Sequence, residues 1–433
     1  MAIKLPKFKK LLRPFKIALG FSLKIIKVVL DFFVPKITWK SAVLSSLHSI
    51  WLIAVSLLWL GHANIMDGFG FMNDYVNFRT FVNHVVLQKP PPPDIAENFL
   101  LINTSRNNQI VPLDNDNTIN KVITDRRLLA EKLSILDQNS DRIAFVLCDV
   151  FFDSPSGDYE SDSLLQEVIM SLSKKGKFAM PAYYNDAEKE LIEPIFAGKT
   201  GLSQYRSSYL NKQFLKFSLI AYGQYTQLPL IAFQSVHGKK LEKRRLGIIN
   251  YYTTSGRLSL NTIIPAFRYT QANLVEGLNY YHLGLFEDYF IGEDQVVIIG
   301  DFAGLTDVHH TIADFSSGAL VLLNIYAALV NGDNQVSAFY LLLLFLVFFY
   351  VSYHTLFYKR KILTGKTRMG RIFSFFANKL NYLILIVLVY VSMILFSHYI
   401  HFLILLSYFA LLDFGKLLII KRRKRRKSRF SVA

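Results

Sequence analysis

Two groups of polar residues in this 433-residue sequence carry side chains that could bind a ligand or move a proton. The first group follows an apolar run and consists of Asp149, Asp153, Asp158, Glu160 and Asp162. Carboxylates at strand ends lie where α/β folds usually bind ligands, and their oxygens suit Ca²⁺ or Mg²⁺. However, the spacing does not match an EF-hand loop. We favour a solvated loop in which Asp162 caps the following helix.

The second group follows the apolar run at residues 296–299 and consists of Asp301, Asp307, His309, His310 and Thr311. An imidazole beside a carboxylate can bind a metal or act as a base. Adjacent residues of an extended segment point to opposite faces, so at most one of the two histidines should join Asp307. The alternative, which we favour, is a polar turn in which Asp307 and Thr311 satisfy backbone groups, with His309 packed below it.

The sequence contains no motif that is typical of an enzyme. It has no Ser-His-Asp order, phosphate-binding glycine loop, CxxC pair or HExxH sequence. We therefore predict no catalytic residue, no resident metal and no cofactor. A periplasmic enzyme that uses the carboxylates between Asp149 and Asp162 is the weakest hypothesis. The one cysteine, Cys148, lies in an apolar run and is expected to be a small buried hydrophobic residue.

The elements that must position both groups follow an alternating order of strands and helices. This order predicts an α/β domain at residues 95–335, with a mixed, largely parallel sheet and flanking helices. A polar turn is expected at 107–117. Helices are expected at 119–137, 163–174 and 318–330, and strands at 99–103, 143–150, 177–183, 228–236, 246–252 and 296–299.

Four apolar stretches outside this domain have the length of transmembrane helices, at residues 42–61, 336–358, 380–397 and 400–420. His48 and Asp413 lie in them, and we expect His48 to pack or form hydrogen bonds and Asp413 to pair with Lys416. Three strongly basic segments flank the spans: residues 1–40, the loop 359–379 and the tail 421–433. All three fall on one side of the membrane only if four spans are present, so this side should be cytoplasmic.

The remaining segments have characteristic compositions. Residues 1–40 are basic and amphipathic, and are expected to lie on anionic lipid or to pack on the spans. Residues 62–94 are a linker that ends in a proline run, which should be extended. The net charge of +17 comes from the terminal and loop segments, since residues 62–336 hold 23 Lys and Arg against 30 Asp and Glu. This distribution argues against nucleic acid as a partner.

Several of these residues together resemble the CHASE2 family of extracytoplasmic sensor domains in bacterial signalling proteins. The resemblance covers residues 95–335, most loosely over 185–290, and also includes the order of one span before the domain and three after it. An upstream segment from Phe145 to Asp153, followed by Asp162, resembles a strand and an acidic segment of the family. The matching residues near the carboxyl end are Gly300, Asp301, Asp307, His309, Thr311, Gly318 and Asn324.

The resemblance implies a multi-pass protein of the bacterial inner membrane, with both termini in the cytoplasm and residues 62–335 outside it. CHASE2 proteins commonly carry a cytoplasmic output domain, whereas this sequence ends soon after its last span. We therefore expect it to act through a membrane protein partner or a separate kinase, and an oligomer is possible. The alternative is a structural or accessory subunit of a cell-envelope complex. The candidate ligand-binding residues are Asp149, Asp153, Asp162, Asp301, Asp307, His309 and Thr311.

Overall fold

The structure is a computed structural model that describes residues 38–60, 78–79, 81–88, 95–112, 120–205, 215–246, 249–304, 307–312, 314–357 and 368–430. The chain divides into two compact units. One unit comprises Met1–Ile53, Leu343–Leu385 and Leu405–Ala433, and the other comprises Ala54–Leu342 and Ile386–Ile404. The predicted α/β domain therefore lies entirely within the second unit.

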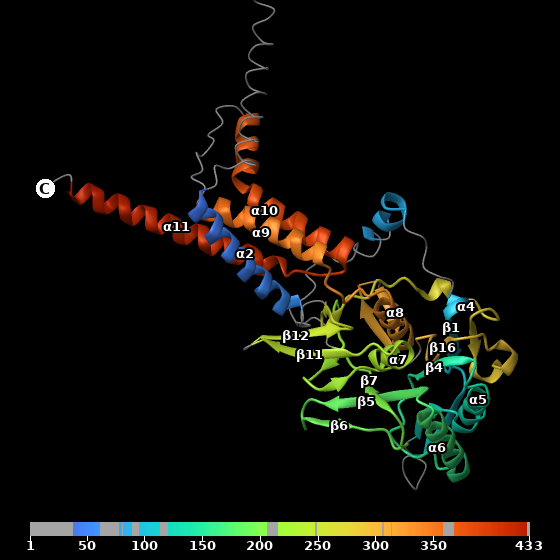
Figure 1. Ribbon diagram of the computed structural model, residues 1–433. Helices are drawn as coiled ribbons and strands as arrows, with labels where there is room; N and C mark the ends of the chain where they lie inside the picture. Colours follow the sequence, from blue (N-terminus) through green and yellow to red (C-terminus); the bar gives the residue numbers. More distant parts are fainter. Residues whose placement is uncertain are drawn as a thin grey trace, which may run out of the picture. The chain divides into compact units, whose positions relative to one another are not determined.

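A largely parallel sheet forms the centre of the second unit (Figure 1). Among the described residues its strands are ordered β15–β1–β16–β4–β5–β6, and β7 pairs with β5. Within this sheet, as far as the structure describes it, only the pairing of β5 with β6 is antiparallel. This confirms the predicted mixed, largely parallel sheet. The strands are β1 (Phe99–Asn103), β4 (Ile143–Cys148), β5 (Phe178–Asn185), β6 (Glu190–Ile192), β7 (Thr200–Leu202), β15 (Tyr280–His282) and β16 (Gln295–Gly300).

Strand β16 is the last of these strands in the sequence, yet it lies between β1 and β4. Val296 pairs with Phe99 of β1 and with Phe145 of β4, and all six residues of β16 are buried. β-Branched residues suit a strand that is buried on both faces, which explains why this run was recognisable in the sequence. The insertion of β16 brings the segment after residue 300 next to the segment after residue 148.

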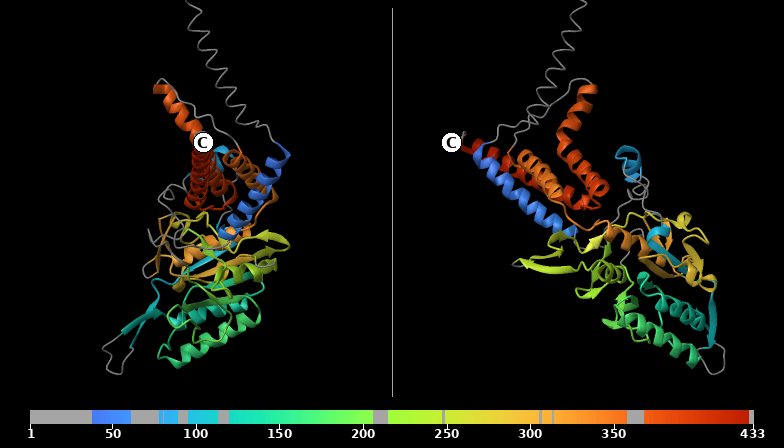
Figure 2. Two further views of the ribbon diagram at one scale, coloured as in Figure 1. Left: turned by 90° about the vertical axis from the view of Figure 1, so that its left-hand side faces the viewer. Right: turned by 45° about the vertical axis from the view of Figure 1, so that its right-hand side comes forward.

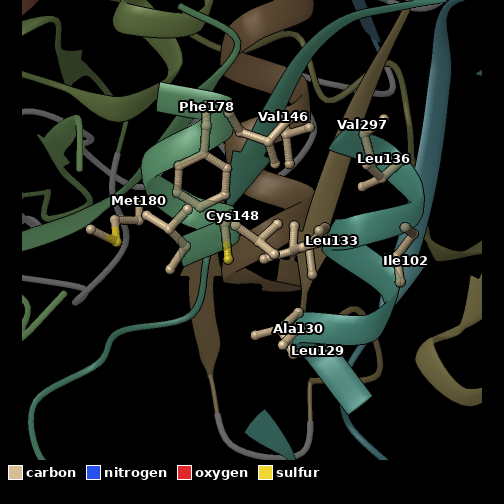
Figure 3. Packing of buried hydrophobic residues seen from close by; sticks show 14 of the residues in the cluster. Ile102, Leu129, Ala130, Leu133, Leu136, Val146, Cys148, Phe178, Met180 and Val297 are labelled. Atoms are coloured by element: carbon tan, nitrogen blue, oxygen red, sulfur yellow. The ribbon is translucent and has the colours of Figure 1, made fainter. Parts of the chain in front are cut away.

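Helices α5 (Arg126–Gln138) and α6 (Tyr159–Lys174) pack against each other and cover one face of the sheet. Figure 3 shows Leu129, Leu133 and Leu136 of α5 against the side chains of the neighbouring strands. Leucines at this spacing share one face of a helix, so α5 turns a continuous apolar stripe to the sheet. Cys148 lies in this core and is fully buried, as predicted.

Helices α7 (Leu228–His237) and α8 (Gly318–Val330) pack together, and they contact β4, β5 and β16. Helix α8 confirms the helix predicted at 318–330, but the strand predicted at 228–236 is wrong. An uninterrupted apolar run fits a buried strand and a buried helix equally well. Pro229 in the first turn and Gly238, which ends the helix with φ of 64°, fix the helical form.

The segment between β1 and β4 begins with a hairpin rather than a turn and a long helix. Strand β2 (Asn108–Pro112) pairs with β3 (Asn120–Thr124), and α5 begins only at Arg126 (Figure 2). Asp125 accepts a hydrogen bond from the amide of Leu128 and so caps the helix. The expected turn is therefore wrong over residues 108–112, whereas 113–117 lie outside the described residues. The expected helix from 119 is wrong over 120–124, which form β3.

The remaining strands form small antiparallel sheets in the second unit. Strands β11 and β12 confirm strand structure near 246–252, but they form a separate three-stranded sheet in the order β11–β12–β13 within the described residues. The short helix α4 (Ile95–Asn98) leads into β1. The other small strands are β8 (Phe217–Ser218), β9 (Ile220–Ala221), β10 (Tyr225–Thr226), β11 (Leu241–Leu246), β12 (Ile249–Thr254), β13 (Arg257–Ser259) and β14 (Thr262–Ile263).

Two helices have the length and hydropathy of a membrane span, over Trp39–Leu58 of α2 and Ala338–Leu356 of α9. A further apolar helical stretch covers Leu380–Phe396. These residues belong to the elements α2 (Trp39–Leu60), α9 (Ala338–Leu356), α10 (Arg368–Phe396) and α11 (Phe402–Phe430). The apolar helix α8 is shorter, and almost all of its residues are buried within the domain.

Polar groups of the apolar helices find partners inside the first unit. His48 lies 2.7 Å from Ser352 Oγ through Nδ1 and 2.6 Å from Tyr408 Oη through Nε2, which confirms a hydrogen-bonding role. The predicted pairing of Asp413 with Lys416 is wrong. Tyr382 Oη donates to Asp413 at 2.9 Å, and Lys416 Nζ donates to the carbonyl of Thr355 at 2.7 Å.

Several predicted segments lie wholly or largely outside the described residues. These are the amphipathic segment 1–40, most of the linker 62–94 with its proline run, the first half of the basic loop 359–379 and the end of the tail 421–433.

Candidate functional site

The candidate site begins where β4 and β16 end. Asp149 follows β4 and Asp301 follows β16, and the two strands are parallel neighbours. The Asp149 amide donates to the carbonyl of Ile299 at 2.6 Å, which fixes the two carboxylates at the same edge of the sheet. Gly300 is needed for this approach, since a Cβ there would lie 2.9 Å from Ala319 Cβ and 3.1 Å from Asp149 Cβ.

A β-hairpin adds the second part of the site. Strand β17 (Val308–Thr311) pairs with β18 (Asp314–Ser317), so the polar turn predicted here is wrong. His309 Nε2 lies 2.7 Å from Asp307 Oδ1, and His309 Nδ1 contacts Tyr205 Oη. A neutral imidazole has one donor and one acceptor nitrogen. The ring therefore donates to Asp307 and accepts from Tyr205.

The two adjacent histidines point to opposite faces of the hairpin, as the alternation of an extended strand predicts. His309 faces Asp307, whereas the His310 ring stacks on Phe315 with centroids 4.9 Å apart. Phe315 is largely exposed. The prediction that one histidine at most joins Asp307 is confirmed, and that histidine is His309.

The N-terminus of α8 lies directly against the His309–Asp307 pair. The amide of Gly318 donates to the Asp307 carbonyl at 3.1 Å, and a Cβ on Gly318 would lie 1.8 Å from Asp307 Oδ2. Only glycine leaves room for this carboxylate.

The surroundings of Asp149 keep this carboxyl group protonated. Burial raises the pKa of Asp149 to about 8, and the negative charges of Asp307 and Asp301 add to this increase. Ser203 Oγ, just after β7, donates to Asp149 Oδ1 at 3.0 Å and partly offsets the effect. At neutral pH Asp149 therefore keeps its proton and offers a hydrogen-bond donor beside the Asp307 carboxylate.

Two tyrosines lie within the electric field of these carboxylates. Burial raises the pKa of Tyr183, and Asp149 and Asp307 raise it further. Burial and then Asp307 also raise the pKa of Tyr205. Both phenols therefore stay protonated at physiological pH, and Tyr205 Oη keeps its proton as a hydrogen-bond donor.

Asp153 and Asp162 lie apart from this cluster and have structural partners. Asp153 forms an ion pair with Lys121 of β3. Asp162 accepts from Arg126 Nη1 at 2.8 Å and from the Ser156 amide at 2.8 Å. These contacts account for both carboxylates. They give no support to the prediction that Asp153 and Asp162 bind a ligand.

Asp162 is also not the cap of helix α6, which begins at Tyr159 instead of Ser163. Asp158 is the N-cap, and it accepts from the amides of Glu160 and Ser161. The earlier start is favoured because Asp158 is a good N-cap residue, and the polar residues Glu160, Ser161 and Asp162 can occupy the first turn. Asp162 then falls within the helix and reaches Arg126.

Arg126 explains why Asp162 is needed. Its guanidinium is buried between the rings of Phe152 and Phe196, at 5.4 Å and 5.0 Å from their centroids. It also donates to the carbonyl of Ser154. A buried cation needs a counter-charge, and Asp162 provides it.

Of the seven candidate residues, four gather at the edge of the sheet: Asp149, Asp301, Asp307 and His309. Thr311 is fully buried, two residues further along the hairpin strand that carries His309. Sequence reasoning missed Ser203, Tyr183 and Tyr205. Gly318 was named from the family pattern, and its contact with Asp307 supplies the physical reason.

The arrangement combines a protonated carboxyl, an ionised carboxylate and an oriented imidazole. It can therefore accept hydrogen bonds from a polar ligand and donate hydrogen bonds to it. The described part of the chain holds no group of three or more His, Cys, Asp or Glu side chains arranged to hold a metal ion.

Comparisons with known proteins give no relative for this chain: no family model, no curated protein and no solved structure matches it. The resemblance to CHASE2 domains therefore stays a prediction.

Proposed function

We propose that this chain is a membrane-anchored sensory or interaction protein of the CHASE2 type, and that its α/β domain binds a small polar ligand. The observation that carries the proposal is the convergence of separate chain segments at the carboxyl edge of the sheet. Asp149 follows β4, Ser203 follows β7, and Asp307 and His309 belong to the segment after β16. Ligands of open α/β sheets bind at this edge.

The proposed location is the bacterial inner membrane, with α2 entering it before the domain and α9, α10 and α11 forming three spans after it. The length and hydropathy of α2 and α9 support this arrangement. The basic residues flanking the predicted spans support a cytoplasmic position for both termini and an extracytoplasmic position for residues 62–335. The basic segments would contact anionic lipid.

A ligand bound in this site would change the position of α8, the helix that leads out of the domain. Asp307 contacts Gly318, the first residue of α8, and α8 ends at Val330, shortly before α9 begins at Ala338. A ligand that displaces Asp307 therefore acts on α8 directly. In this proposal the chain works by binding and not by catalysis. The ligand-bound conformation is recognised by a membrane protein or a separate kinase.

A thermal-stability screen of the full-length protein in detergent tests this function. The panel contains amino acids, polyamines, sugars, Ca²⁺ and Mg²⁺. We expect one chemical class to raise the melting temperature of the wild type and of His310→Ala, but not of His309→Ala. The two variants are matched, because the histidines are adjacent but face opposite sides of the hairpin. No shift with any class, or equal shifts in both variants, would contradict the proposal.

The alternative function is a structural or accessory subunit of a cell-envelope complex. Affinity purification of the intact protein in mild detergent separates the two. Stoichiometric recovery of other membrane or envelope subunits would favour the complex. Recovery of the protein alone, or with a substoichiometric kinase, would favour sensing.

A further inference from the structure

The hairpin of β11 and β12 concentrates positive charge in a domain that is otherwise mildly acidic (Figure 1). Residues 239–257 hold six Lys and Arg against one Glu, whereas residues 62–336 as a whole hold 23 against 30. We call residues 239–257 the basic hairpin. Its cations are Lys239, Lys240, Lys243, Arg244, Arg245 and Arg257.

The cations of the basic hairpin are exposed, and their own segment does little to neutralise them. Its single acid, Glu242, forms an ion pair with Arg244. No carboxylate of the described residues forms an ion pair with Lys239, Lys240 or Lys243. Like charges that gather on one surface repel one another, so this surface favours an anionic partner.

Two tyrosines lie opposite cations within the hairpin. Tyr251 pairs across the strands with Arg244, and Tyr252 pairs with Lys243. Tyrosine is enriched at the level of lipid headgroups, and Lys and Arg attract anionic headgroups. A nucleic acid also binds surfaces of this composition, so the location of the hairpin decides between the two partners.

The basic hairpin is connected through β13 to the segment that enters α9. The amide of Leu260 donates to the Asn334 carbonyl at 2.8 Å, and the amide of Val336 donates to the Leu258 carbonyl at 2.9 Å. Residues 334–336 therefore lie along β13 as a further strand would. Val336 is two residues before α9, which has the length and hydropathy of a membrane span.

The end of the other candidate span is attached to the same region. Thr262 Oγ1, three residues after β13, donates to the carbonyl of Leu60, the last residue of α2. Neighbouring strands lie about 4.8 Å apart, so β11 lies only about 15 Å to the side of residues 334–336. These contacts hold the basic hairpin beside the ends of two candidate spans.

We propose that the basic hairpin binds the anionic phospholipid headgroups of the membrane that α2 and α9 enter. This inference rests on the proposed membrane anchoring and adds a second, electrostatic contact with the same bilayer. Headgroup phosphates complement the charge of the hairpin. Its connections to α2 and α9 favour lipid over a nucleic acid or an acidic protein, because they keep the cations beside the bilayer at all times.

Fluorescence quenching of the full-length protein in lipid vesicles tests this contact. Asn250→Cys places a fluorophore opposite Arg245, and native Cys148 is fully buried and stays unlabelled. The vesicles contain phosphatidylcholine alone or with phosphatidylglycerol, and some lipids carry a headgroup nitroxide as quencher. We expect about fivefold more quenching in the anionic vesicles, which is the effect of one cation at an anionic surface, and loss of this difference at high salt. A fluorophore at Tyr159→Cys on α6 should show no difference.

Two triple variants of the labelled protein test which charges make the contact. One removes three cations of the basic hairpin, by Lys239→Gln, Lys240→Gln and Lys243→Gln. The other removes three exposed cations elsewhere in the domain, by Arg127→Gln, Lys174→Gln and Lys189→Gln. The first should remove most of the preference for anionic vesicles, and the second should leave it unchanged. All six side chains are exposed, so both variants should keep the wild-type melting temperature.

Equal quenching in the two kinds of vesicle, or equal losses in the two triple variants, would overturn the lipid contact. Shielding of the fluorophore by added nucleic acid or acidic protein, without headgroup quenching, would overturn it as well. Flotation of the vesicles reports on the anchoring separately. Protein that floats with both kinds of vesicle but shows no quenching refutes only the lipid contact, whereas protein that fails to float refutes the anchoring and the contact together.

Discussion

Replacing Asp149 by asparagine is expected to stabilise the domain, and to do so only when the pH is high. The ordinary pKa of this carboxyl is 3.8, and in the folded protein burial and the charges of Asp307 and Asp301 raise it to about 8. Between these values the unfolded chain has released the proton while the folded domain retains it. Stability therefore falls as the pH rises from one value to the other, and it levels off above the folded pKa.

The size of this effect follows from the displacement of the pKa. Each unit corresponds to 1.36 kcal/mol, so the shift from 3.8 to about 8 sets an upper bound of about 6 kcal/mol. Asp149 is partly exposed, and water at the edge of the sheet screens its charge. We therefore expect Asp149→Asn to gain about 2 to 3 kcal/mol at about pH 9, and nothing below about pH 4.

Hydrogen exchange measured by mass spectrometry suits this test, because it reports on peptides of β4 and β16 and not on the whole chain. Amides of these central strands exchange only through large-scale opening, so their protection gives the stability of the domain. Asparagine can accept from Ser203 and donate as the protonated acid does, so the site keeps its geometry.

Asp153→Asn is the matched control. This carboxylate follows the same strand, but hydrogen bonds with Lys121 and Ser154 outweigh its burial and lower its pKa. Its substitution should cost a little stability at high pH, which is the opposite sign. A gain for Asp149→Asn that is equal at low and high pH, or no gain at any pH, would refute the reasoning.

Two further substitutions test the roles of neighbouring residues. Gly318→Ala should change the melting temperature only slightly, because the new Cβ meets the end of the flexible Asp307 side chain, 1.8 Å away, and displaces this carboxylate. It should nevertheless abolish ligand stabilisation in the thermal screen, and retained stabilisation would contradict the assigned site. Asp162→Ala should lower the free energy of unfolding by about 3 kcal/mol, because it leaves the buried guanidinium of Arg126 without this counter-charge. Asp153→Ala removes a half-exposed pair and should cost less than about 1 kcal/mol, so equal losses would refute the distinction.

The elements with one consistent signal were predictable from the sequence. Strands β1, β4 and β16 are short apolar runs bounded by polar residues, and each appears within a few residues of its predicted range. The separation of His309 from His310 also followed from strand alternation. Such features depend on local sequence, which is why they could be read without the fold.

The errors arose where local signals were ambiguous or where partners come from distant segments. The apolar run of α7 has no periodicity that separates strand from helix. Ser203 and Tyr205 follow the three-residue strand β7, and only the pairing of β7 with β5 carries them to Asp149 and His309. Nothing in their own neighbourhood marks them, so the complete site required the tertiary structure.

We propose that the α/β domain is held outside the membrane by spans whose basic flanking segments lie in the cytoplasm. Cysteine labelling of intact cells with a membrane-impermeant maleimide tests it most directly, because native Cys148 is buried. Our account predicts that Tyr159→Cys is labelled in intact cells, whereas Ser428→Cys in the basic tail is labelled only after permeabilisation. Labelling of Tyr159→Cys only after permeabilisation would contradict it.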